Sequence, residues 1–207
     1  MNPQQFIQTI APIAQKLRRE GSPLFPSVRI AQSALETGWK IPSWNNMVGL
    51  KVGSGQTNQY WQGRSVNSKT WEVYNEQRVD TRANFRAYDS IEDSFRDQDL
   101  LFNLKRYQGV REAKSPEEQA HQLYKSGYAT DPLYAQKIIA IIQQYGLKQY
   151  DLIPREGEEY MLTPEDANKI IRFLSAGWFV VQGNKQAEAE FNRLANELRK
   201  ASGQPPQ

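Results

Sequence analysis

One acidic residue stands out because of its neighbours in the sequence. Glu36 lies in AQSALETGWK, near the end of an apolar helical stretch and just before Gly38 and Trp39. A carboxyl group beside large apolar side chains is poorly solvated, which raises its pKa and keeps a proton available for transfer. Such a group suits the general acid of a hydrolase. The alternative is a solvated surface glutamate on an amphipathic helix, which the helix taken alone favours because most glutamates are exposed.

The sequence offers few other groups for catalysis. Cysteine is absent, and His121 is the single histidine. Thiol catalysis and disulfides are therefore excluded, and neither a histidine-based metal site nor a serine–histidine triad is expected. The acidic residues between positions 89 and 99 lack the spacing of a calcium loop and suit the start of a helix. We expect no metal ion and no cofactor.

Composition places the chain among ordinary globular proteins. Its 207 residues are 39% hydrophobic and 24% charged, which allows one domain with its own core and a small appendage. No apolar run is long enough to span a bilayer, so a membrane is not an expected partner. The net charge is +3, with the positive excess in residues 1–150. This suits an anionic polymer, but ordinary solubility explains it equally well, and no nucleic-acid-binding motif is present.

Helices are expected to position Glu36. Asn2-Pro3 is a typical helix start, and apolar residues follow at helical spacing as far as Leu17. Pro26 opens a second helix, which ends near Gly38. Residues 42–69 are rich in Gly, Asn, Ser and aromatic residues, which is typical of a loop.

A change of period after this loop predicts a β-hairpin. From Arg78 to Tyr88 apolar and polar residues alternate, as in a half-buried strand. Residues 70–74 are the expected partner strand, with the turn at Asn75-Glu76.

Helices resume after the hairpin. Ser90 and Asp93 form a capping-box pattern that opens one of them. Two further helices are expected, from Ser115-Pro116 to Gly127 and from Asp131-Pro132 to Gly146. Residues 1–150 are therefore predicted to form one mainly α (α+β) domain, with a β-hairpin inserted after the second helix and a cleft between the helical and β lobes.

A short polar linker at residues 151–160 separates a smaller segment. Thr163-Pro164 starts a helix, Gly183-Asn184 makes a turn, and a second amphipathic helix follows. Residues 161–203 are thus predicted to be a helical hairpin near the lower size limit for independent folding. We expect it to pack on the main domain or on another copy of itself.

Several segments together resemble a known family. They are ALETGW, WNNMVGLK, TWEVY, FRAYDS and GYATDPLYAQKI, in this order between residues 5 and 147. This set of segments resembles the one found in the glucosaminidase family (glycoside hydrolase family 73), which includes flagellar-assembly muramidase domains, autolysins and phage lysins. The resemblance implies a lysozyme-like fold and an endo-β-N-acetylglucosaminidase. Its substrate would be bacterial peptidoglycan, cut at the β-1,4 bond after N-acetylglucosamine.

The same resemblance implies roles for two acidic residues. Glu36 occupies the position of the family's catalytic acid and would protonate the leaving glycosidic oxygen. Glu72 in TWEVY matches the second acid, carried on the hairpin, which would activate water or stabilise the oxocarbenium-like charge. Here Asn75-Glu76 replaces the usual Asn-Gly, so Glu76 is a rival second acid. The alternative for Glu72 is an ordinary exposed strand residue.

Further residues are expected to bind the sugar chain. Tyr128 in GYATD matches a tyrosine of the family's cleft, where its hydroxyl would contact the substrate's acetamido group or the acid's carboxylate. Asn45 and Asn46 would shape the floor of the cleft. Aromatic side chains stack on the C–H faces of sugars, and the candidates are Trp39, Trp44, Trp61 and Tyr134. The alternative for each aromatic residue is a place in the core, which Trp44 is expected to share.

The C-terminal hairpin resembles the appendage of endolysins from Gram-positive, Bacillus-like hosts. Wall binding, formation of a homodimer and simple packing stay open as its role. The N-terminus lacks the pattern of a signal peptide. We therefore expect a phage or prophage endolysin that stays in the host cytoplasm until its release to the cell wall, or a secreted protein if the sequence has been trimmed.

Two other functions stay open. An N-acetylmuramidase would cut the other glycosidic bond of the same polymer, and a non-catalytic module would only bind the wall. The stereochemical course is also open: an inverting, a retaining or a substrate-assisted reaction. The sequence favours inversion or substrate assistance.

Overall fold

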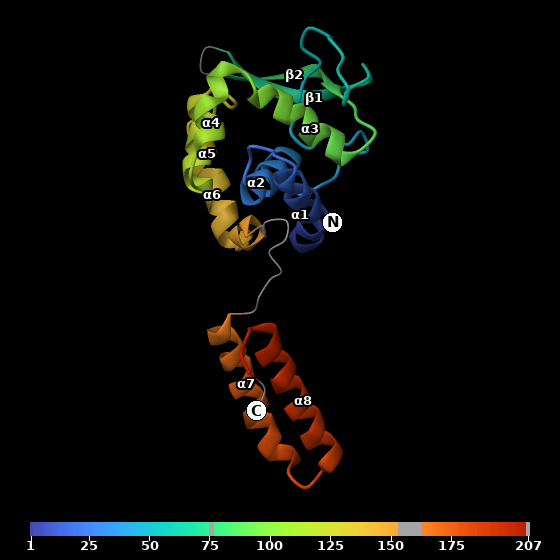
Figure 1. Cartoon of the computed structure of the whole chain (residues 1–207). Helices are drawn as coiled ribbons and strands as arrows, with labels where there is room; N and C mark the ends of the chain where they lie inside the picture. The colour runs from blue at the N-terminus through green and yellow to red at the C-terminus, as the bar shows by residue number, and fades with distance from the viewer. Residues whose placement is uncertain (75–76, 153–162, 206–207) are drawn as a thin grey trace. The chain divides into compact units, whose positions relative to one another are not determined.

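The computed structural model describes residues 1–74, 77–152 and 163–205, apart from the side chains of residues 70–80. The chain divides into two compact units, Met1–Ile153 and Pro154–Gln207. Figure 1 shows the helices and strands of both units. In the described part of the chain, no helix is long and apolar enough to cross a membrane.

Two helices open the first unit. α1 (Pro3–Arg19) has Asn2 as its N-cap, because the Asn2 side chain accepts a hydrogen bond from the backbone N–H of the third helical residue. α2 (Pro26–Thr37) starts at a proline and ends at Gly38, whose φ of 59° lies in the left-handed region that glycine adopts at little cost. The predicted starts of both helices and the end at Gly38 are confirmed.

The predicted β-hairpin is confirmed and is longer than expected. β1 (Ser65–Tyr74) pairs antiparallel with β2 (Gln77–Arg86), from Ser65 opposite Arg86 to Tyr74 opposite Gln77. β1 therefore begins inside the stretch predicted as loop. The reason is that its first five residues are polar except for Val66 and carry no apolar alternation, while pairing with β2 satisfies their backbone groups.

Short helices complete the first unit. They are α3 (Ile91–Phe102), η1 (Lys105–Tyr107), α4 (Gln108–Glu112), α5 (Pro116–Lys125), α6 (Tyr134–Gln144) and η2 (Leu147–Asp151). Ser90 and Ser115 cap α3 and α5 with their side chains, as predicted. α6 begins at Tyr134 rather than at Pro132, because the Asp131 carboxylate accepts a hydrogen bond from the N–H of Leu133 and holds a turn there.

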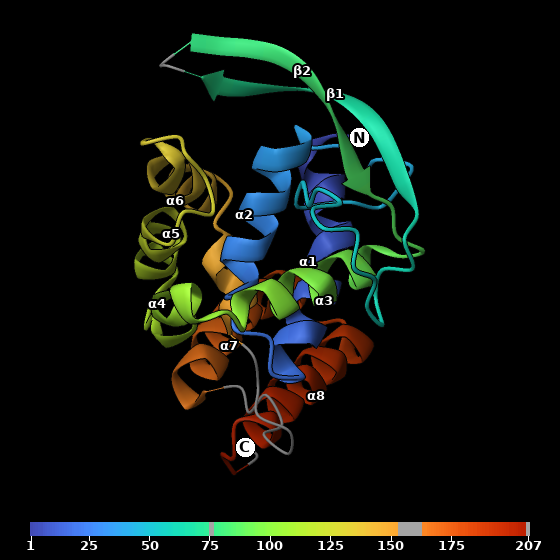
Figure 2. The same cartoon turned by 90° about the horizontal axis from the view of Figure 1, so that it is seen from above.

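α2 is the central helix of the first unit. Its first nine residues are buried, and it packs against α1, α5, α6 and η2. Figure 2 shows α1 on one side of α2, α6 and α5 on the other, and the end of α2 directed toward the β-hairpin. A residue in the last turn of α2 is therefore fixed on a rigid, buried support and faces the hairpin.

The second unit is a helical hairpin. α7 (Pro164–Trp178) and α8 (Lys185–Ala201) pack against each other, and the short helix η3 (Phe179–Val181) leads into the turn. Gly177 lets the helices approach closely, since a Cβ there would lie 3.1 Å from the Phe191 ring. Among the described residues of this unit, Ala167 and Ile171 are the buried apolar ones.

Candidate active site

A large cleft in the first unit brings together several of the predicted site residues. Its volume is about 1110 Å³, and its walls come from the end of α2, residues 40–51, the base of the β-hairpin and residues 127–137. Glu36, Asn46, Tyr128 and Tyr134 line it, although they are distant in the sequence. A cleft of this size accommodates several sugar rings, which is more than a small-molecule pocket requires.

Glu36 sits in the last turn of α2, on the wall of this cleft. The hydroxyl of Tyr134 donates a hydrogen bond to Glu36 Oε1 at 3.2 Å. A Cβ on Gly49 would lie 3.5 Å from Glu36 Oε2, and Gly49 has a φ of +66°, so a glycine fits this turn best. The carboxyl group is thus held between α6 and the loop after residue 45.

The surroundings favour a protonated Glu36 at neutral pH. The side chain is open to the cleft, but the cleft walls replace much of the bulk water around it. This desolvation raises the pKa of Glu36 from 4.5 to about 7, and the hydrogen bond from Tyr134 acts in the opposite direction. The carbonyl end of α2 adds a partial negative charge that also disfavours the ionised form. A carboxyl group with this pKa can donate a proton near pH 7, as a general acid must.

Tyr128 lies beside this pair but does not bond to Glu36. Its hydroxyl donates to the carbonyl of Val48 at 3.0 Å and accepts from Gln98 Nε2 at 3.0 Å. Its ring lies 6.1 Å from the ring of Tyr134. Burial raises the pKa of Tyr128 above its ordinary value, so the phenol is neutral and serves as a hydrogen-bonding group.

The two asparagines occupy different places. Asn46 is buried, lines the cleft and donates to the carbonyls of Leu50 and Arg86, so it ties the cleft loop to β2. Asn45 adopts a left-handed φ of 55° and donates to the carbonyls of Tyr88 and Asp89. Asn45 is outside the set of described residues that line the cleft, so the structure gives it a role in holding the loop.

The tryptophans predicted to stack on sugars separate into two groups. Trp44 lines the cleft. Trp61 is 1% exposed and donates from its indole to the carbonyl of Arg64, and Trp39 packs against the rings of Phe6 and Tyr145 at 5.6 and 4.7 Å. Neither belongs to the described lining of the cleft. Their rings are occupied by protein contacts, which does not support sugar stacking by Trp39 or Trp61.

Tyr134 also has a role different from the predicted one. It is 4% exposed and its hydroxyl faces Glu36, so it is a hydrogen-bond donor to the acid rather than a stacking platform. Helical periodicity placed Tyr134 inward but carried no information about which polar group it would meet.

The second acid is located only by its backbone. Glu72 lies in β1 opposite Val79 in β2, and its side chain lies outside the described residues, as does the whole of Glu76. The base of the same hairpin contributes Ser68, Lys69 and Phe85 to the cleft. The strand that carries Glu72 therefore borders the cleft that contains Glu36.

Basic side chains predominate among the charged residues in the described lining of the cleft. The basic ones are Lys40, Lys51, Lys69, Arg106 and Lys137, and the acidic ones are Glu36 and Asp131. Lys137 pairs with Asp131 at 2.5 Å. In the described part of the chain, no group of three or more His, Asp or Glu residues is arranged to hold a metal ion. The cleft therefore favours an anionic chain and offers proton transfer by a carboxyl group.

A buried polar cluster next to the site was not predicted. Arg29, Gln32 and Gln98 are 1%, 0% and 0% exposed and are hydrogen-bonded to one another. The available signal was a polar pair inside the apolar helix 26–37, since buried polar groups need partners. Their partners come from α3, which the sequence does not place.

Comparisons with a family model and with known relatives point to the same family. The family model described as mannosyl-glycoprotein endo-beta-N-acetylglucosaminidase (Glucosaminidase) matches residues 11–147. The exo-glucosaminidase LytG of Bacillus subtilis is 38% identical over 158 residues, with 72% of this chain and 53% of LytG covered. The peptidoglycan hydrolase FlgJ of Pseudomonas aeruginosa is 36% identical over 163 residues, with 74% of this chain and 39% of FlgJ covered. The chain thus spans about half the length of these relatives, or less.

Solved structures agree with these relatives. A peptidoglycan hydrolase mutant from Sphingomonas sp. A1 has a TM-score of 0.61 at 33% identity, and the match covers 71% of this chain and 97% of that one. The catalytic domain of the autolysin Auto from Listeria monocytogenes has a TM-score of 0.58 at 33% identity, over 72% and 86%. These likenesses confirm the predicted lysozyme-like fold class. The protein belongs to the glucosaminidase family of glycoside hydrolases.

Proposed function

We propose that the protein is an endo-β-N-acetylglucosaminidase that hydrolyses the β-1,4 bond after N-acetylglucosamine in bacterial peptidoglycan. The observation that carries this proposal is the Glu36 carboxyl group, which opens into the cleft, accepts a hydrogen bond from Tyr134 and has a pKa raised to about 7. Membership of the glucosaminidase family supplies the bond type, and the basic residues of the cleft suit the anionic stem peptides of the wall.

In the proposed reaction Glu36 is the general acid. Its proton passes to the glycosidic oxygen as the bond from C1 to that oxygen breaks. A water oxygen then forms the new bond to C1, and its proton passes to a second carboxylate, for which we propose Glu72. The products are a new reducing N-acetylglucosamine end and a free hydroxyl on the next sugar. Inversion and substrate assistance both fit this assignment and differ in the nucleophile that first meets C1.

The test uses purified cell walls and identifies the new reducing end. Digests by the parent protein are reduced with borohydride and analysed by mass spectrometry. Reduced N-acetylglucosamine is the expected end group, and reduced N-acetylmuramic acid would show a muramidase instead. The length of the released glycan distinguishes internal cleavage from removal of terminal units. Removal of terminal units is the mode that the name of the relative, exo-glucosaminidase LytG, states.

Variants test the assigned acid. Glu36→Gln keeps the side-chain shape and is expected to lower turnover by about 10² to 10⁴-fold, the usual contribution of a general acid. Glu112→Gln, at an exposed glutamate of α4, is the matched control and is expected to keep full activity. If Glu36→Gln digests walls at the parent rate, the acid assignment is wrong.

The choice between the two candidate second acids needs a separate pair of variants. Glu72→Gln is expected to lower turnover by at least about 10²-fold if this carboxylate takes the water proton. Glu76→Gln is expected to stay within about twofold of the parent. The reverse pattern would move the role to Glu76, and unchanged rates for both would favour substrate assistance.

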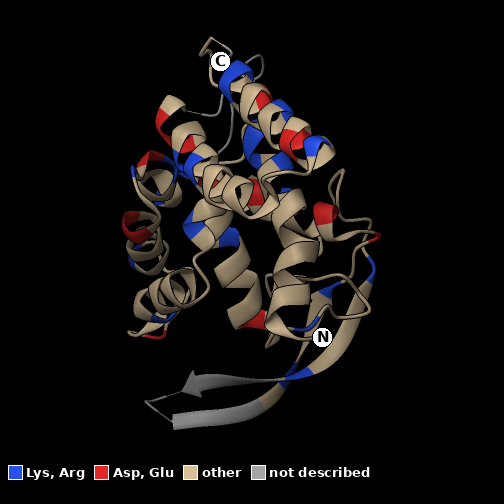
Figure 3. Cartoon of the chain, turned by 90° about the horizontal axis from the view of Figure 1, so that it is seen from below, with Lys and Arg blue, Asp and Glu red and all other residues tan. Residues whose placement is uncertain are grey.

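We also propose that the second unit forms a homodimer. Several large apolar side chains of this hairpin are exposed, namely Ile170, Phe173, Phe179, Val180 and Leu194. Two helices alone cannot bury them, whereas two hairpins packed as a four-helix bundle can. Figure 3 shows positive and negative charges interspersed on the helix next to the C-terminus, which suits a copy of the same surface better than an anionic polymer.

Sedimentation equilibrium of the full chain tests the dimer. Phe173→Glu, at a side chain that is 79% exposed, is expected to convert a dimer to a monomer with little change in fold. Lys185→Glu, outside the apolar face, is the control. If the parent protein is a monomer, the dimer proposal is wrong. If the hairpin is then also needed for the protein to sediment with purified walls, its role is wall binding.

We further propose that the protein serves lysis of a Gram-positive host from within, as an endolysin held in the cytoplasm until the membrane is opened. The resemblance of the hairpin sequence to endolysin appendages supports this. Expression in a Bacillus host with and without a co-expressed holin tests it, and lysis that needs no holin would contradict it.

A further inference from the structure

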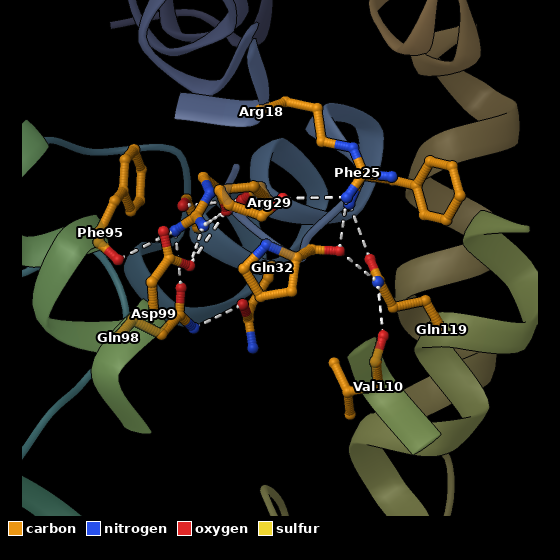
Figure 4. Close-up of polar contacts among 12 residues, drawn as sticks. Arg18, Phe25, Arg29, Gln32, Phe95, Gln98, Asp99, Val110 and Gln119 are labelled. Atoms are coloured by element: carbon orange, nitrogen blue, oxygen red, sulfur yellow. Dashed lines mark hydrogen bonds and ion pairs between the residues drawn. The ribbon is translucent and has the colours of Figure 1, made fainter. Parts of the chain in front are cut away.

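A chain of buried hydrogen bonds runs from α3 and α2 to the catalytic acid. Arg29 Nη1 donates to Gln98 Oε1 at 3.0 Å, and Gln98 Nε2 donates to Gln32 Oε1 at 2.7 Å. Gln32 Nε2 donates to the Tyr134 hydroxyl at 2.9 Å, and this hydroxyl reaches Glu36 at 3.2 Å. Figure 4 shows Arg29 and Gln98 side by side and the dashed contact from Gln98 toward Gln32.

The direction of every bond in this chain follows from its first member. A guanidinium group has donors and no acceptor, so the Gln98 atom that faces Arg29 must be its oxygen. The Gln98 amide nitrogen is then on the other side and can only donate, which requires the oxygen of Gln32 there. The Gln32 nitrogen in turn donates to Tyr134. Because that hydroxyl already accepts a hydrogen bond, its own proton is free to point at Glu36.

The first member of the chain is itself fixed. Arg29 is 1% exposed, its Nη2 pairs with Asp99 at 2.5 Å and donates to Ser22, and its guanidinium lies 4.8 Å from the Phe95 ring centroid. A guanidinium group has N–H donors and no acceptor, so Arg29 cannot accept a hydrogen bond from Gln98 and cannot reverse the chain. This buried position is an expensive one for a charge unless it is paired and hydrogen-bonded.

We propose that Arg29, Gln98 and Gln32 are positioning residues, which act through Tyr134 by aiming its hydroxyl proton at the Glu36 carboxyl group. The proposal rests on the proposed function of Glu36 as the general acid. It assigns a role to three core residues that contact no substrate. A hydroxyl without this constraint could rotate its proton away from Glu36 and leave two oxygen lone pairs facing each other.

The groups around Glu36 allow the hydrogen bond from Tyr134 to change the pKa of its carboxyl group. Among the described residues, the titratable groups next to it are the phenols of Tyr134 and Tyr128, both neutral because burial raises their pKa values. The charged side chains of the described lining are Lys40, Lys51, Lys69, Arg106, Asp131 and Lys137. Desolvation raises the pKa of Glu36, and the bond from Tyr134 lowers it. Loss of an oriented donor is therefore expected to raise this pKa.

The experiment measures the Glu36 carboxyl titration directly and the pH profile of wall hydrolysis alongside it. Carbon-13 NMR of protein labelled at glutamate carboxyls gives the pKa, assigned by the signal missing in Glu36→Gln. Gln32→Met keeps the size of the side chain and removes its donor. It is expected to raise the Glu36 pKa by about one unit, the size of one hydrogen bond to a charged group, with kcat lowered and KM nearly unchanged.

A double-mutant cycle shows whether Gln32 acts through Tyr134. Tyr134→Phe alone is expected to raise the Glu36 pKa by the same amount as Gln32→Met. The double variant is expected to raise this pKa no further than Tyr134→Phe alone. Equal shifts from Gln32→Met in both backgrounds would overturn the proposal. The NMR readout keeps this result separate from the proposed function, since it stands even if the walls are not digested.

Two further variants separate positioning from simple packing. Gln98→Met is uncharged and cannot hold the Gln32 oxygen, so the Gln32 amide is free to turn over and the Tyr134 proton is no longer directed at Glu36. The expected rise in the Glu36 pKa is no larger than that of Tyr134→Phe. Gln119→Met is the matched control. Gln119 is 0% exposed and bonds to Pro23 and Phe25 just before α2 and to Val110 of α4. It is expected to lower Tm and leave the Glu36 pKa in place, and a Gln32→Met protein that behaved in the same way would contradict the proposal.

Discussion

At the scale of single residues, the site is defined by a carboxyl group whose solvation is restricted. Glu36 is open to the cleft, yet the cleft walls raise its pKa to about 7. The hydrogen bond from Tyr134 limits the rise, because a donor favours the charged form. Desolvation therefore keeps Glu36 protonated up to about neutral pH, and the bond from Tyr134 limits how far this range extends.

The pH dependence of activity follows from this value. A general acid works only in its protonated form, so the proton on Glu36 is available below a pH of about 7 and is lost above it. Hydrolysis is expected to fall by about tenfold per pH unit on the alkaline side. Initial rates on solubilised peptidoglycan between pH 5 and 9 measure this. An alkaline limb that starts only above pH 9 would argue against Glu36 as the acid.

Stability is expected to depend on pH through the same residue. Between the ordinary glutamate pKa of 4.5 and the folded value of about 7, the folded state binds a proton that the unfolded state has released. Stability attributable to Glu36 is thus present below pH 4.5 and declines as pH rises to 7. Glu36→Gln removes this decline, so its Tm at pH 8 is expected to exceed that of the parent by about 2 °C, a small gain because the group is open to solvent. Thermal melts at pH 5 and pH 8 test this, and an equal difference at both would contradict it.

At the scale of elements, the β-hairpin is tied to the helical part by one buried carboxylate. Asp97 of α3 is 3% exposed and accepts from Arg86, Tyr88 and Asn58, each at 2.7 Å. The Arg86 guanidinium also lies 4.4 Å from the Trp61 ring centroid. Trp61 therefore belongs to the anchor of the hairpin, which explains why a tryptophan predicted for sugar binding lies in the interior.

Removal of this anchor has a predictable cost. Asp97→Ala leaves the Arg86 charge without its partner in a largely buried place, which is expected to lower the free energy of unfolding by about 3 kcal/mol. Activity is expected to fall as well, because the strand that carries Glu72 loses its fixed base. Chemical denaturation and wall digestion measure the two effects. Asp89→Ala, at a more exposed ion pair with Arg64, is the control and is expected to cost less than about 1 kcal/mol.

In the whole molecule, the described lining of the cleft comes from the first unit. The lining residues that the structure describes lie within Met1–Ile153. The second unit buries Ala167 and Ile171 as its apolar residues in the described range, too little for a core of its own at this size. The first unit is therefore expected to fold and to form the cleft by itself. The second unit is expected to need a further apolar surface to cover its exposed side chains.

Truncation after residue 153 tests this difference. The shortened chain is expected to keep the Tm of the catalytic unit and its rate on short soluble glycan fragments, because no cleft residue is removed. It is expected to be monomeric and slower on intact walls if the hairpin holds two catalytic units together. A loss of folding on truncation would show that the hairpin is part of the catalytic unit.

The order and type of most elements can be predicted from the sequence alone, and the sequence also points to Glu36 as the candidate acid. Caps at Asn2, Ser90 and Ser115, the stop at Gly38 and the alternation after residue 78 act locally, so each can be predicted from a few neighbouring residues. The ordered family segments then indicated Glu36.

Which polar groups meet around Glu36 depends on how the helices pack and cannot be predicted from the local sequence. The bond from Tyr134 to Glu36 joins residues 98 apart, and the bond from Gln98 to Gln32 joins residues 66 apart. Periodicity tells which face of a helix points inward but not which side chain it meets there. The expectation that Tyr134 and Trp61 stack on sugars rests on their aromatic rings, which carry no information about their neighbours in the fold. Hydrogen bonds depend on positions within a few tenths of an ångström, and these arise from the packing of α2, α3 and α6 together.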